Sequence, residues 1–164
     1  IAGCGSSESD CGYKDGRAKS AKFAVPSGLV VSEDDTIYVC DYSNHCIRQI
    51  RYDTVSTISG SPMRYGLKDG SMGTHKLPYG LALDSDGNLL VCEINNAVRI
   101  IDLKSNTVSS GYFEGIANFY CICKGRGSSF FMGCGTKVVK VDRIWDAWER
   151  YLWIGHLKEE PQYC

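Results

Sequence analysis

Two stretches of the sequence, VPSGLVV at residues 25–31 and LPYGLAL at residues 77–83, are copies of one motif. Gly28 and Gly80 occupy the same place in the two copies and lie 52 residues apart. The likeness continues without a gap through an acidic turn and a second run of aliphatic and aromatic residues. A repeat of this length predicts an architecture built from stacked copies of one supersecondary unit.

The two copies also share three pairs of flanking segments. Residues 44–50 match residues 95–101, and both segments carry an arginine. Residues 13–16 match residues 67–70, and both end in Lys-Asp-Gly. Residues 1–3 match residues 58–60, and both end in glycine. The similarity therefore spans most of the first 111 residues. A weaker third copy follows at residues 115–155, where the spacing of short apolar runs is retained.

Each copy contains four short runs of alternating or β-branched residues, separated by Gly, Asp and Asn. A period of two residues predicts β-strands, and four-stranded units of about 40–50 residues are typical of β-propeller blades. We therefore predict an all-β chain with blade 1 at residues 27–60, blade 2 at 78–111 and blade 3 at 115–155. The remaining segments are a disulfide loop and inter-blade strand at 1–26, a loop at 61–77 and a C-terminal tail at 156–164. The residues expected to fill the layers between blades are Leu29, Val31, Ile37, Val39, Leu81, Leu83, Leu89 and Val91.

Residues 26–50 carry the pattern P-x-G-L, an acidic turn, Y-V-x-D and N-H-x-I-R-x-I, which resembles the NHL repeat. Residues 2–23 are similar to the long inter-blade loop of extracellular and bacterial NHL proteins, whereas blade 3 departs from the family pattern. The resemblance implies a β-propeller, usually six-bladed, in which Arg48 and Arg99 bridge blade edges. Three NHL-type blades then form half of a six-bladed ring or part of a larger propeller or assembly.

Nine cysteines among 164 residues are more than a cytosolic protein usually carries. A zinc site usually needs paired Cys or clustered His, and here the only close pair is Cys121 and Cys123. We therefore favour disulfides over zinc and predict a secreted, extracellular protein. The disulfide candidates are Cys4 with Cys11, Cys40 with Cys46, and Cys92 with Cys134. The odd count leaves one thiol over, and the terminal Cys164 is the candidate for a bond between chains.

Three features could carry chemistry, and each has a simpler structural interpretation. DSDGN at residues 84–88 resembles the start of a calcium loop, but the Glu that an EF-hand needs at its twelfth position is missing, which favours a hairpin turn. His45 and Cys46 are neighbours on a strand and point to opposite faces, so His45 cannot activate Cys46. Asp41 and Glu93 end equivalent strands, and we expect them to accept backbone N–H groups of the following turn. We therefore predict no catalytic residue, no metal site and no cofactor.

A segment rich in Trp and Arg at residues 143–153 has no counterpart in the first two copies. Such residues dominate the energetics of protein interfaces, although a small core beneath a loop explains them equally well. The candidate partner-surface residues are Trp145, Trp148, Arg150, Tyr151 and Trp153.

The formal net charge is −1 and no Lys/Arg cluster is present, which argues against nucleic-acid binding. The sequence also contains no apolar run of the roughly 18 residues that a membrane-spanning helix needs, so we expect no membrane insertion. Three blades leave two sheet faces uncovered, which predicts contact with further blades, a second copy or another protein chain.

Two functions remain open. The main hypothesis is a non-catalytic extracellular structural and protein-interaction module that assembles through its blade faces, with a fibre or surface appendage as the candidate assembly. A glycan is a second candidate partner. The alternative is a fragment of a propeller enzyme, similar to amidating lyases or gluconolactonases, whose active site lies in missing blades.

Overall fold

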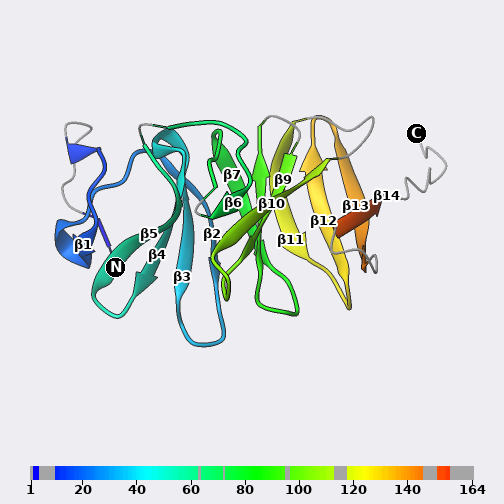
Figure 1. Ribbon diagram of the computed structural model, residues 1–164, viewed down its shortest axis with the longest axis horizontal. Coiled ribbons are helices and arrows are strands. Elements are labelled where there is room, and N and C mark those ends of the chain that lie inside the picture. Colours follow the sequence, from blue (N-terminus) through cyan, green and yellow to red (C-terminus); the bar gives the residue numbers. More distant parts are fainter. Residues whose placement is uncertain are drawn as a thin grey trace.

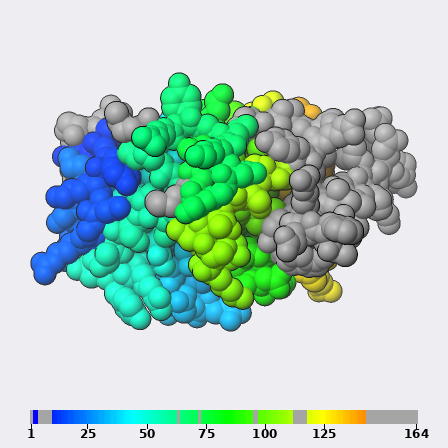
Figure 2. Space-filling view, in the orientation of Figure 1, coloured from blue at the N-terminus to red at the C-terminus, as the bar shows by residue number. Residues whose placement is uncertain are grey.

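The computed structural model describes residues 2–3, 10–62, 64–71, 73–94, 97–112, 118–145 and 151–155, with the backbone alone described at Tyr112 and residues 143–145 and 151–155. Figure 1 shows three β-sheets that follow one another along the molecule in chain order, and the chain colours run along the space-filling view of Figure 2 in the same order. The strands are β1 (Gly16–Arg17), β2 (Pro26–Val31), β3 (Ile37–Asp41), β4 (Cys46–Arg51), β5 (Thr54–Gly60), β6 (Gly70–Ser71), β7 (Pro78–Leu83), β8 (Leu89–Glu93), β9 (Ala97–Asp102), β10 (Thr107–Tyr112), β11 (Phe119–Lys124), β12 (Ser129–Cys134), β13 (Lys137–Trp145) and β14 (Tyr151–Gly155). Two 3-10 turns, η2 (Ala18–Ser20) and η3 (Tyr42–Asn44), complete the elements, and the described residues contain no α-helix.

Each sheet is an antiparallel meander of four consecutive strands. The orders are β1-β5-β4-β3-β2, β6-β10-β9-β8-β7 and β11-β12-β13-β14. The two-residue strands β1 and β6 add a fifth, outer strand to the first two sheets, and they come from the matching loop segments that end in Lys-Asp-Gly. The prediction of an all-β chain of four-stranded blades is confirmed. We refer to the three sheets as blades 1, 2 and 3.

The first strand of each blade lies at the edge of its sheet, and these three strands run beside one another. Strand β7 contacts β2 on one side and β11 on the other. A Cβ atom at Gly28 would lie 2.5 Å from the carbonyl oxygen of Tyr79, and one at Gly80 would lie 3.0 Å from the Cα of Cys121. Glycine is therefore required at both places, because any side chain would push the neighbouring strand away.

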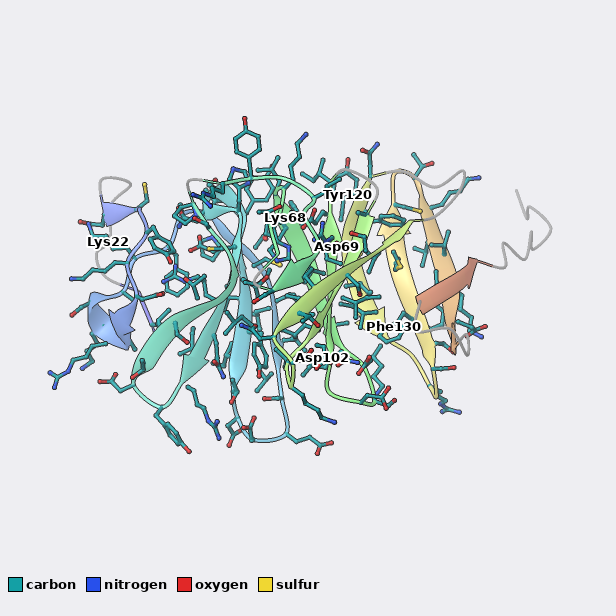
Figure 3. The ribbon with its side chains drawn as sticks, viewed as in Figure 1. Lys22, Lys68, Asp69, Asp102, Tyr120 and Phe130 are labelled. Carbon is teal, nitrogen blue, oxygen red and sulfur yellow. The ribbon has the colours of Figure 1, made fainter. Side chains whose placement is uncertain are left out.

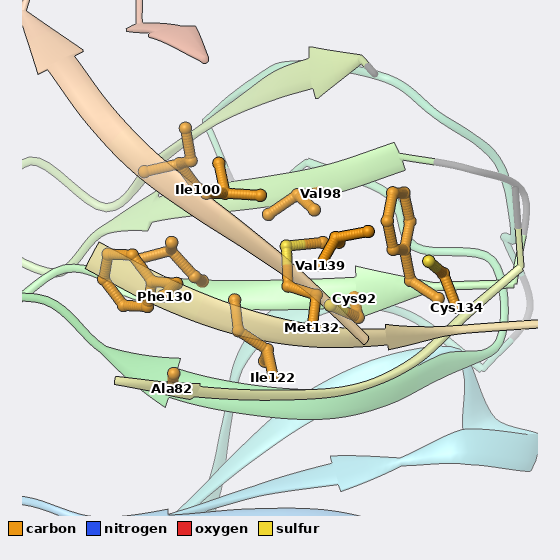
Figure 4. Packing of buried hydrophobic residues seen from close by; sticks show 12 residues of the cluster. Ala82, Cys92, Val98, Ile100, Ile122, Phe130, Met132, Cys134 and Val139 are labelled. Atoms are coloured by element: carbon orange, nitrogen blue, oxygen red, sulfur yellow. The ribbon is translucent and has the colours of Figure 1, made fainter. Parts of the chain in front are cut away.

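Two apolar layers hold the blades together. Between blades 1 and 2 lie residues that alternate along the strands, namely Tyr38, Cys40, Ile47, Leu81, Leu89, Val91, Ile101 and Val108. Figure 4 shows the second layer, where Phe130 and Met132 of blade 3 pack against Val98 and Ile100 of blade 2. Alternate residues of the blade 2 strands therefore serve the two layers, as the period of a strand requires.

The two outer faces of the arc keep apolar side chains exposed. On blade 1, Leu29 is 61% exposed and Val31 is 50% exposed, whereas Val39 is buried. On blade 3, Val138 is 77% exposed, and Phe131 points away from blade 2 because its neighbours on β12 face that blade. The 3-10 turn η2 and the residues after it cover only part of blade 1, where Ala18 and Ala21 pack against Val55.

The predicted disulfides are absent from the part of the chain that the structure describes. Seven cysteines are free thiols, namely Cys11, Cys40, Cys46, Cys92, Cys121, Cys123 and Cys134. The pair proposed within blade 1 fails because Cys40 lies opposite Ile47 while Cys46 lies opposite Asp41, so the two thiols leave opposite faces of the sheet. Cys92 and Cys134 are both buried in the layer between blades 2 and 3, unbonded. Cys4 and Cys164 lie outside the described residues.

No helix in the described ranges is long and apolar enough to cross a membrane. Of the predicted partner-surface residues, Trp148 and Arg150 lie outside these ranges, and only the backbone is described at Trp145, Tyr151 and Trp153.

Candidate functional site

Blade 1 buries an arginine beneath the loop that precedes the blade. Arg48 on β4 donates from Nη1 to Asp41 Oδ2 at 2.6 Å, and both side chains are fully buried. Its Nη2 donates to Asp15 Oδ1 at 2.6 Å and to the carbonyl oxygen of Lys14 at 2.9 Å. The rings of Tyr13 and Phe23 lie over the guanidinium, each 4.8 Å from its central carbon. Burial alone would lower the pKa of Arg48, but the hydrogen bonds to Asp41 and Asp15 raise it above its usual value.

Blade 2 repeats this arrangement with the matching residues. Arg99 on β9 is fully buried, and its Nη2 donates to the carbonyl oxygen of Lys68 at 2.8 Å and lies 3.0 Å from Asp69 Oδ1. Figure 3 marks Lys68 and Asp69 in front of blade 2, next to β6. The loop repeat found in the sequence thus has a physical cause, since each copy supplies a carbonyl oxygen and a carboxylate to an arginine. Each arginine ties a loop to its own blade.

A buried chain of three polar side chains joins blades 1 and 2. Ser59 Oγ at the end of β5 lies 2.8 Å from His75 Nε2, and His75 Nδ1 lies 2.7 Å from Glu93 Oε1 at the end of β8. All three residues are fully buried. The other carboxylate oxygen of Glu93 has no hydrogen-bond partner among the described residues, and neither has Nη1 of Arg99.

One repeat earlier in the sequence, the residues differ at all three positions. The repeat aligns Ala2, Phe23 and Asp41 with Ser59, His75 and Glu93. Asp41 is short enough to bind Arg48 directly, whereas the longer Glu93 is turned toward His75 and leaves Arg99 without a carboxylate on that side. The changes at His75 and Glu93 therefore act together, because the imidazole and the carboxylate are each other's buried hydrogen-bond partners.

The order of groups in this chain is that of a nucleophile, a base and an acid that orients the base. Its burial prevents a substrate from reaching Ser59 in this arrangement. The chain instead fastens the last strand of blade 1 and the loop between the blades to the second strand of blade 2.

The inner strands form a shallow, uncharged wall. A hollow of about 330 Å³ is lined by the same three positions of each blade, residues 27–29, 79–81 and 120–122. We call these nine residues the channel wall, because β2, β7 and β11 are the inner strands of successive blades. Its described lining contains Tyr79 and Tyr120 and no charged side chain.

Tyrosine rings link the blades along the rim of the channel wall. The Tyr79 and Tyr120 rings meet edge to face with centroids 5.9 Å apart, and Tyr42 of η3 meets Tyr79 in the same way at 5.7 Å. Tyr79 and Tyr120 remain 39% and 43% exposed. Figure 3 shows Tyr120 at the end of blade 3 where β11 begins. In blade 1 the equivalent position is Ser27, whose hydroxyl donates to the carbonyl oxygen of Tyr79 at 3.0 Å.

The features singled out in the sequence have structural roles. Asp84 Oδ1 accepts the backbone N–H groups of Asp86 and Asn88, each at 2.8 Å, so this carboxylate is used within the hairpin turn. His45 Nδ1 accepts the N–H of Leu77, and burial lowers the pKa of His45. Burial raises the pKa of Cys46 to about 12, so its thiol stays protonated. The described ranges contain no cluster of three or more His, Cys, Asp or Glu that could hold a metal ion.

The roles expected for the two strand-end carboxylates need correction. Asp41 Oδ1 does accept a backbone N–H, but from Ala24 in the preceding loop, while its Oδ2 binds Arg48. Glu93 binds His75. Sequence reasoning missed His75 because His occupies the place of Phe23, and only the sequence repeat, applied to three positions at once, could have exposed the change.

Three antiparallel sheets of four consecutive strands, whose first strands lie beside one another, define the class of this protein as a β-propeller. Residues 23–50 match the family model of the NHL repeat. The chain is 35% identical over 97 residues to "Protein SUPPRESSOR OF QUENCHING 1, chloroplastic" of Arabidopsis thaliana, an alignment that covers 56% of this chain and 9% of that protein.

Solved structures with similar folds include two enzymes. A virginiamycin B lyase from Staphylococcus aureus has a TM-score of 0.57 at 17% identity, covering 80% of this chain and 41% of that one. A gluconolactonase from Xanthomonas campestris has a TM-score of 0.52 at 16% identity, and the match covers 74% of this chain and 36% of that one. A structural genomics protein of unknown function from Bacteroides thetaiotaomicron has a TM-score of 0.58 at 20% identity, and the match covers 65% of this chain and 32% of that one. The chain thus spans less than half the length of each.

These comparisons overturn two predictions. The expectation of a non-catalytic extracellular structural module, in a fibre or surface appendage, is wrong, because the solved neighbours named above include enzymes and the curated relative is a chloroplastic protein. The prediction of a secreted protein is wrong for the same reason. It rested on the cysteine count, and the described cysteines are buried or exposed thiols without disulfides.

Proposed function

We propose that this chain is a three-blade segment of a propeller enzyme, and that its reaction centre is completed by blades outside the segment. The proposal also places the segment in a larger protein of the chloroplast, as in the curated relative. Its fold neighbours that are enzymes act on virginiamycin B and on gluconolactone, so a ring-opening reaction on a cyclic ester is the class we favour.

The observation that carries the proposal is that the inner strands at the two ends of the arc, β2 and β11, each lack an inner-strand neighbour on one side within the described residues. Among the strands that the structure describes, β7 has an inner strand on each side, whereas β2 and β11 each have one. The apolar residues Leu29 and Val138 lie exposed on the two end faces. Propeller blades are stable when neighbouring blades cover both faces, so further blades are the natural cover for these two faces.

The chemistry of the channel wall fits a partial site. Its half-exposed tyrosines can contact a substrate, but the described lining contains no carboxylate, imidazole or amine to move a proton. Acid–base catalysis needs such groups within hydrogen-bond reach of the reacting atoms. The remaining blades would supply them across the channel.

The test is an activity assay on the intact protein that contains this segment. We expect it to hydrolyse gluconolactone or to linearise virginiamycin B. We also expect Tyr79→Ala and Tyr120→Ala to raise KM, whereas Tyr52→Ala, at an exposed hairpin tip, leaves kcat and KM unchanged. An intact, folded protein that opens neither ring contradicts the proposal, and so does an intact protein found outside the plastid after cell fractionation.

A further inference from the structure

We infer that the tyrosine rim of the channel wall binds a neutral sugar ring. The inference rests on the proposed function in one respect, because it takes the channel as the place where the substrate lies. It goes further by naming the chemistry that the wall recognises. The residues that carry it are Tyr42, Tyr79 and Tyr120, one from blade 1, one from blade 2 and one from blade 3.

The first argument is the exposure of the tyrosines. A tyrosine on an inner strand that served only to pack blades together would be covered, as Tyr38 is between blades 1 and 2. Tyr79 and Tyr120 instead keep about two fifths of their surface exposed beside the hollow. Their edge-to-face contacts also hold the two rings in fixed positions, so a ligand that stacks on them loses little side-chain entropy of the protein.

The second argument is the balance of polar and apolar groups. The channel wall offers the ring faces and phenol hydroxyls of Tyr79 and Tyr120. Strands β2, β7 and β11 are sheet edges, and an edge strand presents backbone N–H and C=O groups that its own sheet does not pair. A pyranose ring matches this combination, because one face carries C–H groups and its rim carries hydroxyls that both donate and accept.

The third argument is charge. The lining residues at 27–29, 79–81 and 120–122 are all uncharged, so nothing in the described wall compensates a phosphate, a carboxylate or an ammonium group on the ligand. A charged sugar would lose hydration without gaining an ion pair there. A flat aromatic compound would use the rings but not the backbone groups of the edge strands. The wall therefore selects a neutral sugar over both.

The test measures binding to the intact protein by saturation-transfer NMR. The probes are methyl β-glucopyranoside, its charged counterparts glucosamine and glucose 6-phosphate, and the aromatic compound p-cresol. We expect millimolar binding of the neutral sugar, weakened at least about tenfold by Tyr79→Ala or Tyr120→Ala. Tyr79→Phe should keep most of the affinity that Tyr79→Ala loses, and Tyr52→Ala, which changes a more exposed tyrosine outside the wall, should leave the affinity intact.

Each other outcome overturns the inference. It fails if the neutral sugar does not bind, if a charged sugar binds equally well, if p-cresol alone binds, or if the tyrosine variants bind as tightly as the parent. Sugar binding without turnover of gluconolactone or virginiamycin B removes the proposed enzyme function and leaves the sugar site. Turnover without sugar binding removes the sugar site and leaves the enzyme function.

Discussion

Cys121 on β11 lies directly opposite Gly133 on β12, and a Cβ atom at Gly133 would lie 2.6 Å from the Cys121 sulfur. In blade 2 the same two positions hold Gly80 and Cys92, in the reverse order. Both blades therefore have one cysteine and one glycine at this point of the sheet. The cysteine is on the second strand in blade 2 and on the inner strand in blade 3. This exchange of positions removes from blade 3 the glycine that lets the next inner strand approach closely.

The first prediction follows from this exchange. Gly133→Cys alone should lower the free energy of unfolding by about 1–3 kcal/mol, because the new side chain overlaps the Cys121 sulfur. Adding Cys121→Gly should recover most of that loss, since the double variant has the blade 2 order. Urea unfolding of the four proteins of this double-mutant cycle measures the coupling, which should be about 0.5–3 kcal/mol. Strict additivity would mean that the two positions do not share one space.

The second prediction concerns the buried arginine of blade 1. Arg48→Ala leaves Asp41 buried without its cation and should destabilise the protein by about 3–5 kcal/mol. The matched control is Arg51→Ala on the same strand, whose ion pair with Asp34 is half exposed and is worth at most about 1 kcal/mol. Equal losses for the two variants in thermal or urea unfolding would show that the Arg48 clamp is not a principal element of blade 1.

The third prediction concerns the Ser59–His75–Glu93 chain. His75→Ala should lower the free energy of unfolding by about 1–3 kcal/mol, because it removes the hydrogen bond that the buried carboxylate of Glu93 makes to His75. The triple variant Ser59→Ala, His75→Phe and Glu93→Asp installs the residue types of Ala2, Phe23 and Asp41, which we call the blade 1 set. Its shorter carboxylate can reach Arg99. It should be more stable than the single variant. A triple variant less stable than His75→Ala would indicate that the blade 1 set does not suit blade 2.

The fourth prediction is a pH dependence. Burial raises the pKa of Cys46 from 9.0 to about 12, with Asp41 adding in the same direction. The folded state therefore holds this proton more tightly than the unfolded state, so the stability it contributes is fully present below about pH 9 and is lost as the pH rises toward 12. Urea unfolding at pH 8, 9 and 10 should show Cys46→Ala losing less stability than the parent across this range. An equal loss in both proteins would contradict the assignment.

The blades could be predicted because their signals are local and repeated. Residues 25–31 and 77–83 share Pro-x-Gly, alternation and the following acidic turn, and each of these features acts within one hairpin. The two buried arginines could also have been linked to their loops from the sequence, since Lys-Asp-Gly recurs before both: Lys14 lies 34 residues before Arg48 and Lys68 lies 31 residues before Arg99.

The polar chain and the channel wall could not be predicted in the same way. Ser59, His75 and Glu93 are far apart in the sequence, and each alone is an ordinary residue of a strand or loop. Tyr79 and Tyr120 meet only because glycine at position 80 lets β7 and β11 approach. The cysteine count misled the prediction of cellular location, because Cys40, Cys46 and Cys92 serve as small buried apolar residues and the count cannot distinguish that use from disulfides.

An experimental structure of the intact protein tests the central claim most directly. The claim is that this chain is a run of three blades within a propeller that further blades complete. We predict that additional inner strands lie beside β2 and β11 around one channel, and that the added blades cover Leu29 and Val138. A structure in which β2 or β11 borders solvent as the end of an open arc, or in which residues 27–60 and 78–111 do not superpose as blades, would contradict it.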